Sequence, residues 1–345
     1  MKAKIISKRD LAGLVDKLLG EYEIFAPVKK GNLVLFDRVH SGTDAFLEYA
    51  NTLKSPKEIF LPQSEVLFTY SHEQVDGVAN IEAPPGEDRP RLVIGIRPCD
   101  AKAICLFDRV FSGEKYEDSY YRNRRANTAV VAIGCAKPRS TCFCTSVGGG
   151  PFSAEGSDLL LVDIGDDYVV QIGSDKGERL VEALGLADPA EDSLSMLEGV
   201  IRDAEASMAP GLALDGLKEK LDNMFDDPLW SLLTEKCLSC GICTYLCPTC
   251  HCFDIVDEAI DSGGERIRIW DSCQFPLFTL QASGFNPRPT TRERHRQRVM
   301  HKFSYLLDNY GQFGCVGCGR CVTQCPVNLD IRSIITSILM GKVVR

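Results

Sequence analysis

A pattern of closely spaced cysteines occurs twice in this chain and constrains its fold more than any other feature. The two copies occupy residues 237–248 and 315–326, and each has the spacing C-x2-C-x2-C-x3-C-P. A glycine, Gly241 or Gly319, follows the second cysteine of each copy. A short loop with this spacing can place three thiolates around one metal core. The fourth cysteine is turned away, because the proline after it cannot donate a backbone hydrogen bond.

This spacing is typical of bacterial ferredoxins with two [4Fe–4S] clusters, in which the fourth cysteine of each run ligates the other cluster. It therefore predicts two such clusters. Two zinc sites are the alternative, but structural zinc usually takes its ligands from two C-x2-C pairs, and runs of four cysteines before a proline fit that poorly. The predicted ligands are Cys237, Cys240, Cys243 and Cys325 for one cluster, and Cys315, Cys318, Cys321 and Cys247 for the other.

The composition indicates the kind of cellular compartment in which so many cysteines are used. The chain has 345 residues, of which 16 are cysteines and 44% are hydrophobic, so a core can form without disulfides. Its first residues carry charges where a signal peptide needs an apolar run, and no apolar run has the length of a membrane helix. We therefore expect a reducing, cytoplasmic setting without membrane insertion. A formal net charge of −9 argues against nucleic-acid binding.

The first half of the chain has the pattern of an α/β domain. Apolar runs at 92–96 and 129–133 predict two strands, and residues 101–111 between them predict a helix. Cys99 lies just past the first strand and Cys135 just past the second. Ligands on open α/β sheets gather at such strand ends, so these cysteines are candidates for a further site.

Four cysteines of this half form that candidate site. Cys135, Cys142 and Cys144 lie on one predicted loop, and Cys99 lies on the adjacent one, so four thiolates can converge. We interpret them as the ligands of a third [4Fe–4S] cluster, with a structural zinc site and redox-active thiols as the alternatives. Asp100 is a candidate oxygen ligand or hydrogen-bond acceptor beside this site.

Four further cysteines lie outside these sets. Cys250, Cys252 and Cys273 lie between the repeats. They either ligate another metal centre with a non-cysteine fourth ligand, or pack as buried thiols around the clusters. His251 either contributes to such a centre or lies at the surface. Cys105 falls within the predicted helix, where we interpret it as a small buried hydrophobic residue.

The uneven distribution of cysteines predicts two domains and an α+β fold class. Residues 1–220 are expected to form an α/β domain that carries the additional [4Fe–4S] site. Residues 221–345 are expected to form a mostly helical, ferredoxin-like domain with two [4Fe–4S] clusters and a long helical insert.

One stretch between the repeats is strongly basic in an otherwise acidic chain. It is either a solvated helix face or a set of charges that offsets the anionic clusters or docks an acidic partner. Its members are Arg288, Arg292, Arg294, His295, Arg296, Arg298, His301 and Lys302.

Several motifs taken together carry a family resemblance: the cysteine repeat, residues 97–100, 142–144, 248–252, 270–275 and 283–290, and His301-Lys302. They resemble the iron–sulfur beta subunit of cytoplasmic sulfhydrogenases, which are NAD(P)-linked nickel–iron hydrogenases with a sulfur-reducing side activity. The related iron–sulfur component of anaerobic sulfite reductase has a similar layout, as do iron–sulfur subunits that accompany flavin oxidoreductases coupled to heterodisulfide reductases. The resemblance covers nearly the whole chain and is strongest over residues 237–330.

The resemblance implies an electron-transfer subunit that relays electrons between a flavin subunit using NAD(P)H and a catalytic oxidoreductase subunit. The chain itself has no visible dinucleotide, phosphate-binding or flavin fingerprint, and no catalytic histidine arrangement. Two other classes of function stay open. One is an enzyme whose cluster has an open iron site, which the set Cys250, Cys252 and Cys273 would provide; the other is a structural or redox-sensing protein.

Overall fold

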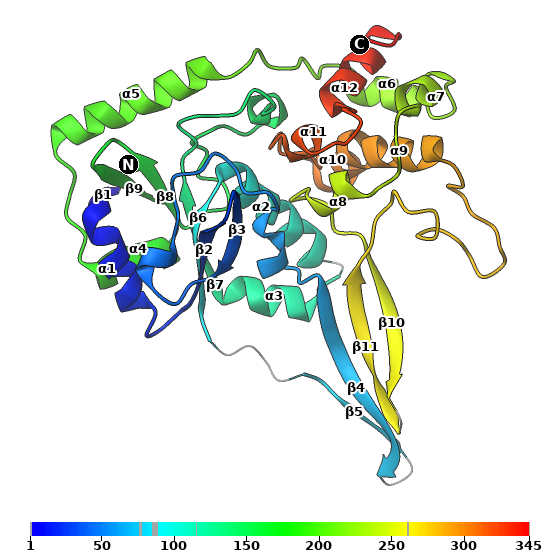
Figure 1. The fold of residues 1–345 in the computed structure, drawn as a ribbon, viewed down its shortest axis with the longest axis horizontal. Coiled ribbons are helices and arrows are strands. Elements are labelled where there is room, and N and C mark those ends of the chain that lie inside the picture. Colours follow the sequence, from blue (N-terminus) through cyan, green and yellow to red (C-terminus); the bar gives the residue numbers. More distant parts are fainter. Residues whose placement is uncertain (1, 76–77, 85–88, 115, 261, 345) are drawn as a thin grey trace.

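The computed structural model describes residues 2–75, 78–84, 89–114, 116–260 and 262–344. A seven-stranded mixed sheet organises the first half, in the order β1-β9-β8-β7-β6-β2-β3 (Figure 1). Its central strands β2, β6, β7 and β8 are parallel, and the outer pairs are antiparallel. The strands are β1 (Ala3–Ser7), β2 (Glu23–Lys30), β3 (Leu33–Arg38), β6 (Arg91–Ile96), β7 (Thr128–Ile133), β8 (Leu159–Asp163) and β9 (Asp167–Ile172).

Helices cover both faces of this sheet because its strands are apolar on both sides. In β6, Leu92 and Ile94 enter one core, whereas Val93 and Ile96 enter the other. Residues 92–94 alternate with the two-residue period of a strand, and an irregularity in the register between Ile94 and Ile96 turns Ile96 to the same side as Val93. The first core includes residues of α1 (Lys8–Leu18) and α4 (Asp175–Leu184). The second includes residues of α2 (Pro98–Phe111), α3 (Ser119–Ala126) and α5 (Glu191–Ser207).

A second, four-stranded sheet extends away from the rest of the molecule, at the bottom of Figure 1. Its antiparallel order is β10-β11-β4-β5, so it takes two strands from each side of residue 220. Glu65 of β4 receives hydrogen bonds from Arg124 of α3 and Arg268 of β11, which ties this sheet to α3. The strands are β4 (Ser64–Val75), β5 (Val78–Glu82), β10 (Phe253–Ile260) and β11 (Gly263–Trp270).

Short helices build a third core around the cysteine repeats, at the upper right of Figure 1. Trp230, Phe303 and Ile335 are fully buried there, and Phe143 and Val147 of the first half pack into the same core. The helices are α6 (Leu217–Asn223), α7 (Leu229–Thr234), α8 (Ile242–Tyr245), α9 (Thr291–Met300), a π-helical turn η4 (His301–Tyr305), α10 (Leu306–Tyr310), α11 (Arg320–Thr323) and α12 (Ile331–Met340).

The mixed α/β character expected from the sequence is confirmed, including the predicted strands at β6 and β7 and the helix between them. The expectation of a mostly helical ferredoxin-like domain with a helical insert is not confirmed. The segment between the repeats contains the hairpin β10–β11 and a long loop as well as α9. Within the described ranges, no helix is both long enough and apolar enough to cross a bilayer.

Candidate metal centres

The predicted N-terminal site lies at one edge of the seven-stranded sheet. Cys99 lies in the first turn of α2, directly after β6, and Cys135 follows β7. Since β6 and β7 are parallel neighbours, their carboxyl ends meet at the same edge. The loop that follows brings Cys142 and Cys144 to the same place. All four thiols line one cavity, which encloses about 370 Å³ including its opening to solvent.

The second cysteine repeat closes this cavity from the other side. Gly317 and Cys318 line it, and the Cys142 thiol lies 3.8 Å from the carbonyl oxygen of Cys318. The Phe143 amide donates to the Gly317 carbonyl at 2.9 Å. A Cβ atom added to Gly317, whose φ is +64°, would lie 2.4 Å from the Phe143 carbonyl carbon. Only glycine permits this approach, which places the N-terminal site directly beside the second repeat.

A buried ion pair joins the same two regions. Asp100 follows Cys99, and Arg320 precedes Cys321; their side chains are bound through two hydrogen bonds of 2.6 and 2.7 Å. Asp100 is 2% exposed and Arg320 is 3% exposed. Both carboxylate oxygens are thus engaged by Arg320, which favours the role of hydrogen-bond acceptor beside the site over the role of metal ligand.

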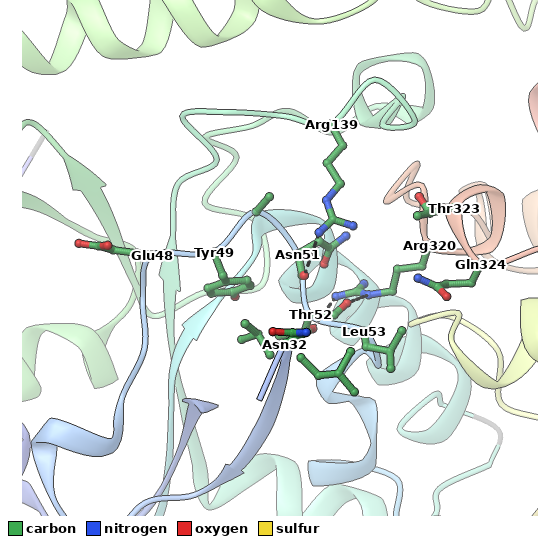
Figure 2. Close-up of a pocket in the computed structure, with 13 residues that line it drawn as sticks. Asn32, Glu48, Tyr49, Asn51, Thr52, Leu53, Arg139, Arg320, Thr323 and Gln324 are labelled. Atoms are coloured by element: carbon green, nitrogen blue, oxygen red, sulfur yellow. Dashed lines mark hydrogen bonds between the residues drawn. The ribbon is translucent and has the colours of Figure 1, made fainter. Parts of the chain in front are cut away.

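The loop formed by residues 48–53 is held against both regions and lines a polar pocket, shown in Figure 2. Arg320 donates to the Thr52 carbonyl and hydroxyl oxygens at 3.0 Å each. Asn51 donates to the Cys318 carbonyl at 3.0 Å. Arg139 also reaches this loop, where it donates to the Asn51 carbonyl at 3.5 Å. This loop therefore supports the wall between the N-terminal site and the second repeat.

A second cavity contains one of the ligand sets predicted from the repeats. Cys237, Cys240, Cys243 and Cys325 all line it, and so does Cys321, which the spacing assigns to the other cluster. The cavity encloses about 450 Å³ including its opening to solvent.

The other predicted set lies deeper. Cys247, Cys315 and Cys318 are buried, and Cys321 is half-buried. The two repeats share one local feature, a backbone amide that donates to the first thiol of each run. Ser239 donates to Cys237 at 3.4 Å, and Gly317 donates to Cys315 at 3.5 Å. Such bonds to sulfur stabilise thiolate character.

Three buried cations lie among these thiols. The Lys302 ammonium donates to the Cys247 thiol at 3.2 Å, to the Thr249 hydroxyl and to the Gly314 carbonyl. The Lys57 ammonium donates to backbone carbonyls and lies 4.1 Å from the centre of the Trp270 ring. Arg298 lines the first-repeat cavity, and its Nε has no hydrogen-bond partner in the described part of the chain.

None of these three cations has a carboxylate partner among the described residues. Burial alone would lower the pKa of Lys302, but the neighbouring Cys247 and Cys250 thiols outweigh it and raise that pKa. A buried charge without a counter-charge is strongly unfavourable. The residues present therefore fit an anionic group bound by the thiolates, and a [4Fe–4S] cluster with four thiolates is such a group.

The basic stretch between the repeats is not a solvated helix face, and that interpretation is wrong. Its central members are buried because α9 packs between the first-repeat cavity and the third core. Both ring nitrogens of His295 lack hydrogen-bond partners at the cavity wall, within the described residues. The alternative interpretation, that these charges offset anionic clusters, agrees with this burial. The buried members are Arg294, His295, Arg296, Arg298 and Lys302.

The cysteines outside the predicted sets have different neighbours. Cys250 forms a hydrogen bond with the Cys247 thiol, whereas Cys252 forms one with Cys273. The Cys273 bond lowers the pKa of Cys252 to about 7, despite burial. Cys105 lies away from both cavities, against Gly156, as a partly buried thiol.

His251 is not a surface histidine. Its ring stacks edge-on against Phe107 and Phe111 and against His301, with ring centres 5.5–5.9 Å apart. Burial lowers the pKa of His251 to about 4, so the ring is neutral at ordinary pH.

The thiols of the described residues are spread rather than clustered around a point. No group of three or more His, Cys, Asp or Glu side chains in that part of the chain is placed to hold one metal ion.

Sequence reasoning alone missed three contributors to these sites. Lys57 and Asn51 lie far along the chain from any cysteine that they approach, and Cys318 faces the N-terminal cavity as well as its own repeat. No sequence signal marks Lys57 or Asn51, because both contacts arise from packing across nearly 200 residues or more.

Comparison with known proteins agrees with these features. Residues 236–329 match the family described as a 4Fe-4S dicluster domain. The sulfhydrogenase 2 subunit beta of Pyrococcus furiosus is 32% identical over 321 residues, which cover 92% of this chain and 92% of that protein. No solved structure matches the chain.

Proposed function

This chain belongs to the family of sulfhydrogenase beta subunits, and on that premise we propose that it relays electrons between a flavin subunit that uses NAD(P)H and a catalytic hydrogenase subunit. The chain is an iron–sulfur electron-transfer subunit. Its part is to hold the redox groups, set their surroundings and dock its partners, rather than to make or break substrate bonds. We place this activity in the cytoplasm.

We assign three cluster sites to the chain. Cys237, Cys240, Cys243 and Cys325 hold the first, and Cys315, Cys318, Cys321 and Cys247 hold the second, within a ferredoxin-like domain of residues 221–345. Cys99, Cys135, Cys142 and Cys144 hold the third, within an α/β domain of residues 1–220. A bound [4Fe–4S] cluster supplies one-electron transfer.

The chain's own groups do the remaining work. The Gly317–Phe143 contact keeps the third site against the second repeat, so that electrons cross a short, packed distance. Lys302 donates to the Cys247 sulfur and places a positive charge beside the second site. Such a charge favours the more negative, reduced state of a cluster.

One observation carries the proposal: buried cations without carboxylate partners lie among the cysteines of the family's dicluster motif. Each thiol set alone is also compatible with zinc or with free thiols. The cations favour a strongly anionic occupant instead, because burying them beside neutral thiols would be costly.

The test is the iron and acid-labile sulfide content of anaerobically purified chain. Three [4Fe–4S] clusters predict about twelve iron atoms per chain. The double variant Cys142→Ser/Cys144→Ser should hold about eight, whereas Cys105→Ser, outside the cavities, should keep about twelve. Stoichiometric zinc in place of iron would refute the proposal, and an unchanged count in the double variant would refute the third site.

Two related assignments differ only in the partners: the iron–sulfur component of an anaerobic sulfite reductase, or that of a flavin oxidoreductase–heterodisulfide reductase system. The neighbouring genes distinguish them, because a nickel–iron large subunit, a sirohaem protein and a heterodisulfide reductase subunit each identify one complex. An enzyme with an open-site cluster receives no specific support, since Cys250 and Cys252 contact different partners.

A further inference from the structure

Two cysteines outside the three assigned ligand sets lie in contact with each other. Cys252 and Cys273 form a hydrogen bond between their thiols, and the Cys273 backbone amide also donates to the Cys252 sulfur. Cys252 is half-buried, whereas Cys273 is only 9% exposed. Two thiols in contact, one of them open to solvent, have the arrangement from which a disulfide forms.

The pair is held at the end of the β10–β11 hairpin that meets α8 (Figure 1). Cys252 directly precedes β10, and the Asp271 amide donates to its carbonyl at 2.9 Å, which extends the antiparallel ladder by one step. Cys273 lies two residues further along. The intervening Ser272 is fully buried, and its hydroxyl lies 2.7 Å from that of Thr244 in α8. The backbone therefore fixes both cysteines beside each other.

The two thiols differ in acidity. The hydrogen bond from Cys273 lowers the pKa of Cys252 to about 7, despite burial, and the buried cations Lys302 and Lys57 act in the same direction. The same hydrogen bond, together with burial, raises the pKa of Cys273. A half-exposed thiolate beside a buried thiol is typical of dithiols that cycle with a disulfide, because the thiolate is the reactive form.

Gln274 connects this pair to the first-repeat site. Its side chain is 1% exposed and lines the first-repeat cavity. The amide nitrogen of Gln274 donates to the Cys273 sulfur at 3.6 Å, and its amide oxygen lies 4.0 Å from the Cys237 sulfur. A second donation, to the Arg294 carbonyl at 3.0 Å, fixes the orientation of the amide. A single side chain therefore separates the pair from a predicted cluster ligand.

We propose that Cys252 and Cys273 form a dithiol–disulfide couple that exchanges an electron pair with the neighbouring iron–sulfur site. The inference rests on the proposed function, which supplies that site. Reduction of the couple breaks the S–S bond and consumes two electrons and two protons, which gives two thiols; oxidation reverses each step. The electrons cross one at a time past Gln274, since a cluster carries single electrons, and the protons are exchanged with solvent at the half-buried Cys252.

The couple gives the chain a place to hold an electron pair. Flavins and nicotinamides donate or accept electrons in pairs, whereas clusters pass them singly. A dithiol beside a cluster can keep the second electron of a pair until the cluster is free to carry it. Dithiols and protein-bound clusters have overlapping ranges of reduction potential, so exchange in both directions is feasible.

The first test is disulfide mapping of the anaerobically purified full chain, equilibrated with redox dyes over the range in which its clusters titrate. Samples are quenched in acid, alkylated and digested, and the peptides joined through Cys252 and Cys273 are quantified by mass. We expect the ratio of joined to free peptides to change tenfold for about every 30 mV, as a two-electron couple requires. Absence of the joined peptides throughout this range would overturn the proposal.

The second test counts electrons taken up by the oxidised, cluster-loaded chain during titration with reduced methyl viologen. The wild-type chain should take up about two electrons more per chain than Cys252→Ser or Cys273→Ser, because neither variant can form the disulfide. The matched control is Cys105→Ser, which removes a partly buried thiol elsewhere and should match the wild type. All four chains should hold the same amount of iron.

Two outcomes of the second test would overturn the proposal. One is equal electron uptake by the wild type and both variants of the pair. The other is a loss of about four iron atoms in Cys252→Ser or Cys273→Ser, which would make that residue a cluster ligand. Wild-type chain without iron would refute the proposed function, whereas disulfide mapping would still decide whether the two thiols form a couple.

Discussion

Lys302 shows how one side chain can adjust a redox site without being a ligand. Its ammonium is buried and donates to the Cys247 sulfur at 3.2 Å. A positive charge there stabilises added negative charge on the sulfur and on any core that the sulfur binds. Residues of this kind are invisible to a search for ligand motifs, because they act through hydrogen bonds to the ligands.

Replacing Lys302 by Met should lower the midpoint potential of one cluster by some tens of millivolts, where about 59 mV equals a tenfold change in a one-electron equilibrium. The reason is that the reduced, more negative state loses more from removal of the charge than the oxidised state does. Lys302→Arg, which keeps a charge and donors, should shift the potential less. An EPR-monitored redox titration measures both, and an unchanged potential in Lys302→Met would contradict the assigned contact.

Asp100 and Arg320 form the other feature at this scale, a buried ion pair between the two halves of the chain. Asp100→Asn should lower the free energy of unfolding by about 3–5 kcal/mol, because it leaves the Arg320 guanidinium buried without a carboxylate. Replacing both residues by Leu should cost less than the single change. Glu178→Gln removes an exposed partner of Lys2 and should cost much less, because solvent screens that pair. Urea unfolding of anaerobic chain measures all three, and equal losses in the three variants would be incompatible with this account.

At the scale of elements, the contact between the second repeat and the 141–144 loop decides how close two sites lie. The approach depends on Gly317 and Gly319, where an added Cβ would lie within 2.4 and 2.5 Å of that loop. The loop is in turn fixed by β7, whose end supplies Cys135. A parallel strand pair and a ferredoxin-type loop thus meet through two residues without side chains.

Gly317→Ala should force these two elements apart and lower the iron content of the N-terminal site, because the new methyl group would overlap the Phe143 backbone. Gly341→Ala is the matched control: its φ is +67°, close to the +64° of Gly317, but nothing lies within 4 Å of an added Cβ. Both changes carry the cost of a positive φ, roughly 1 kcal/mol. Iron analysis separates the clash from that shared cost, and full iron occupancy in Gly317→Ala would rule out a required close approach.

At the scale of the whole molecule, the regions around the cores differ in whether their stability requires a bound group. The two cores of the seven-stranded sheet consist of apolar side chains on both faces. The region of the repeats instead surrounds its short helices with thiols and buried cations. The seven-stranded sheet with its two cores should be stable by itself. The region of the repeats should depend on the anionic groups that it encloses.

Removal of iron by a chelator under reducing conditions should therefore loosen the molecule unevenly. Hydrogen exchange should become faster over residues 237–325 and 135–147, while β6, β7 and β8 stay protected. The thermal unfolding midpoint of the repeat region should fall by several degrees or more, since a few kcal/mol shift it by that much. Uniform acceleration across the seven-stranded sheet would show that the two regions do not differ in this way.

The sequence by itself determined the features that are local along the chain. The ligand spacing of the repeats, the strands at β6 and β7 and the cysteines at their ends all depend on neighbouring residues, whose geometry is set by short-range rules. The mixed α/β character followed for the same reason. The assignment of clusters to the cysteine sets stays a prediction, although both cavities gather the expected thiols.

Only the tertiary structure decided what lies beside these thiols. It joined β4 and β5 to β10 and β11, buried the basic stretch, separated Cys250 from Cys252 and placed Lys57 near Cys250. These contacts join residues that are distant in sequence. They form only where one fold both packs the apolar cores and gives the buried charges partners. No local sequence pattern predicts these long-range contacts, so only the folded chain shows them.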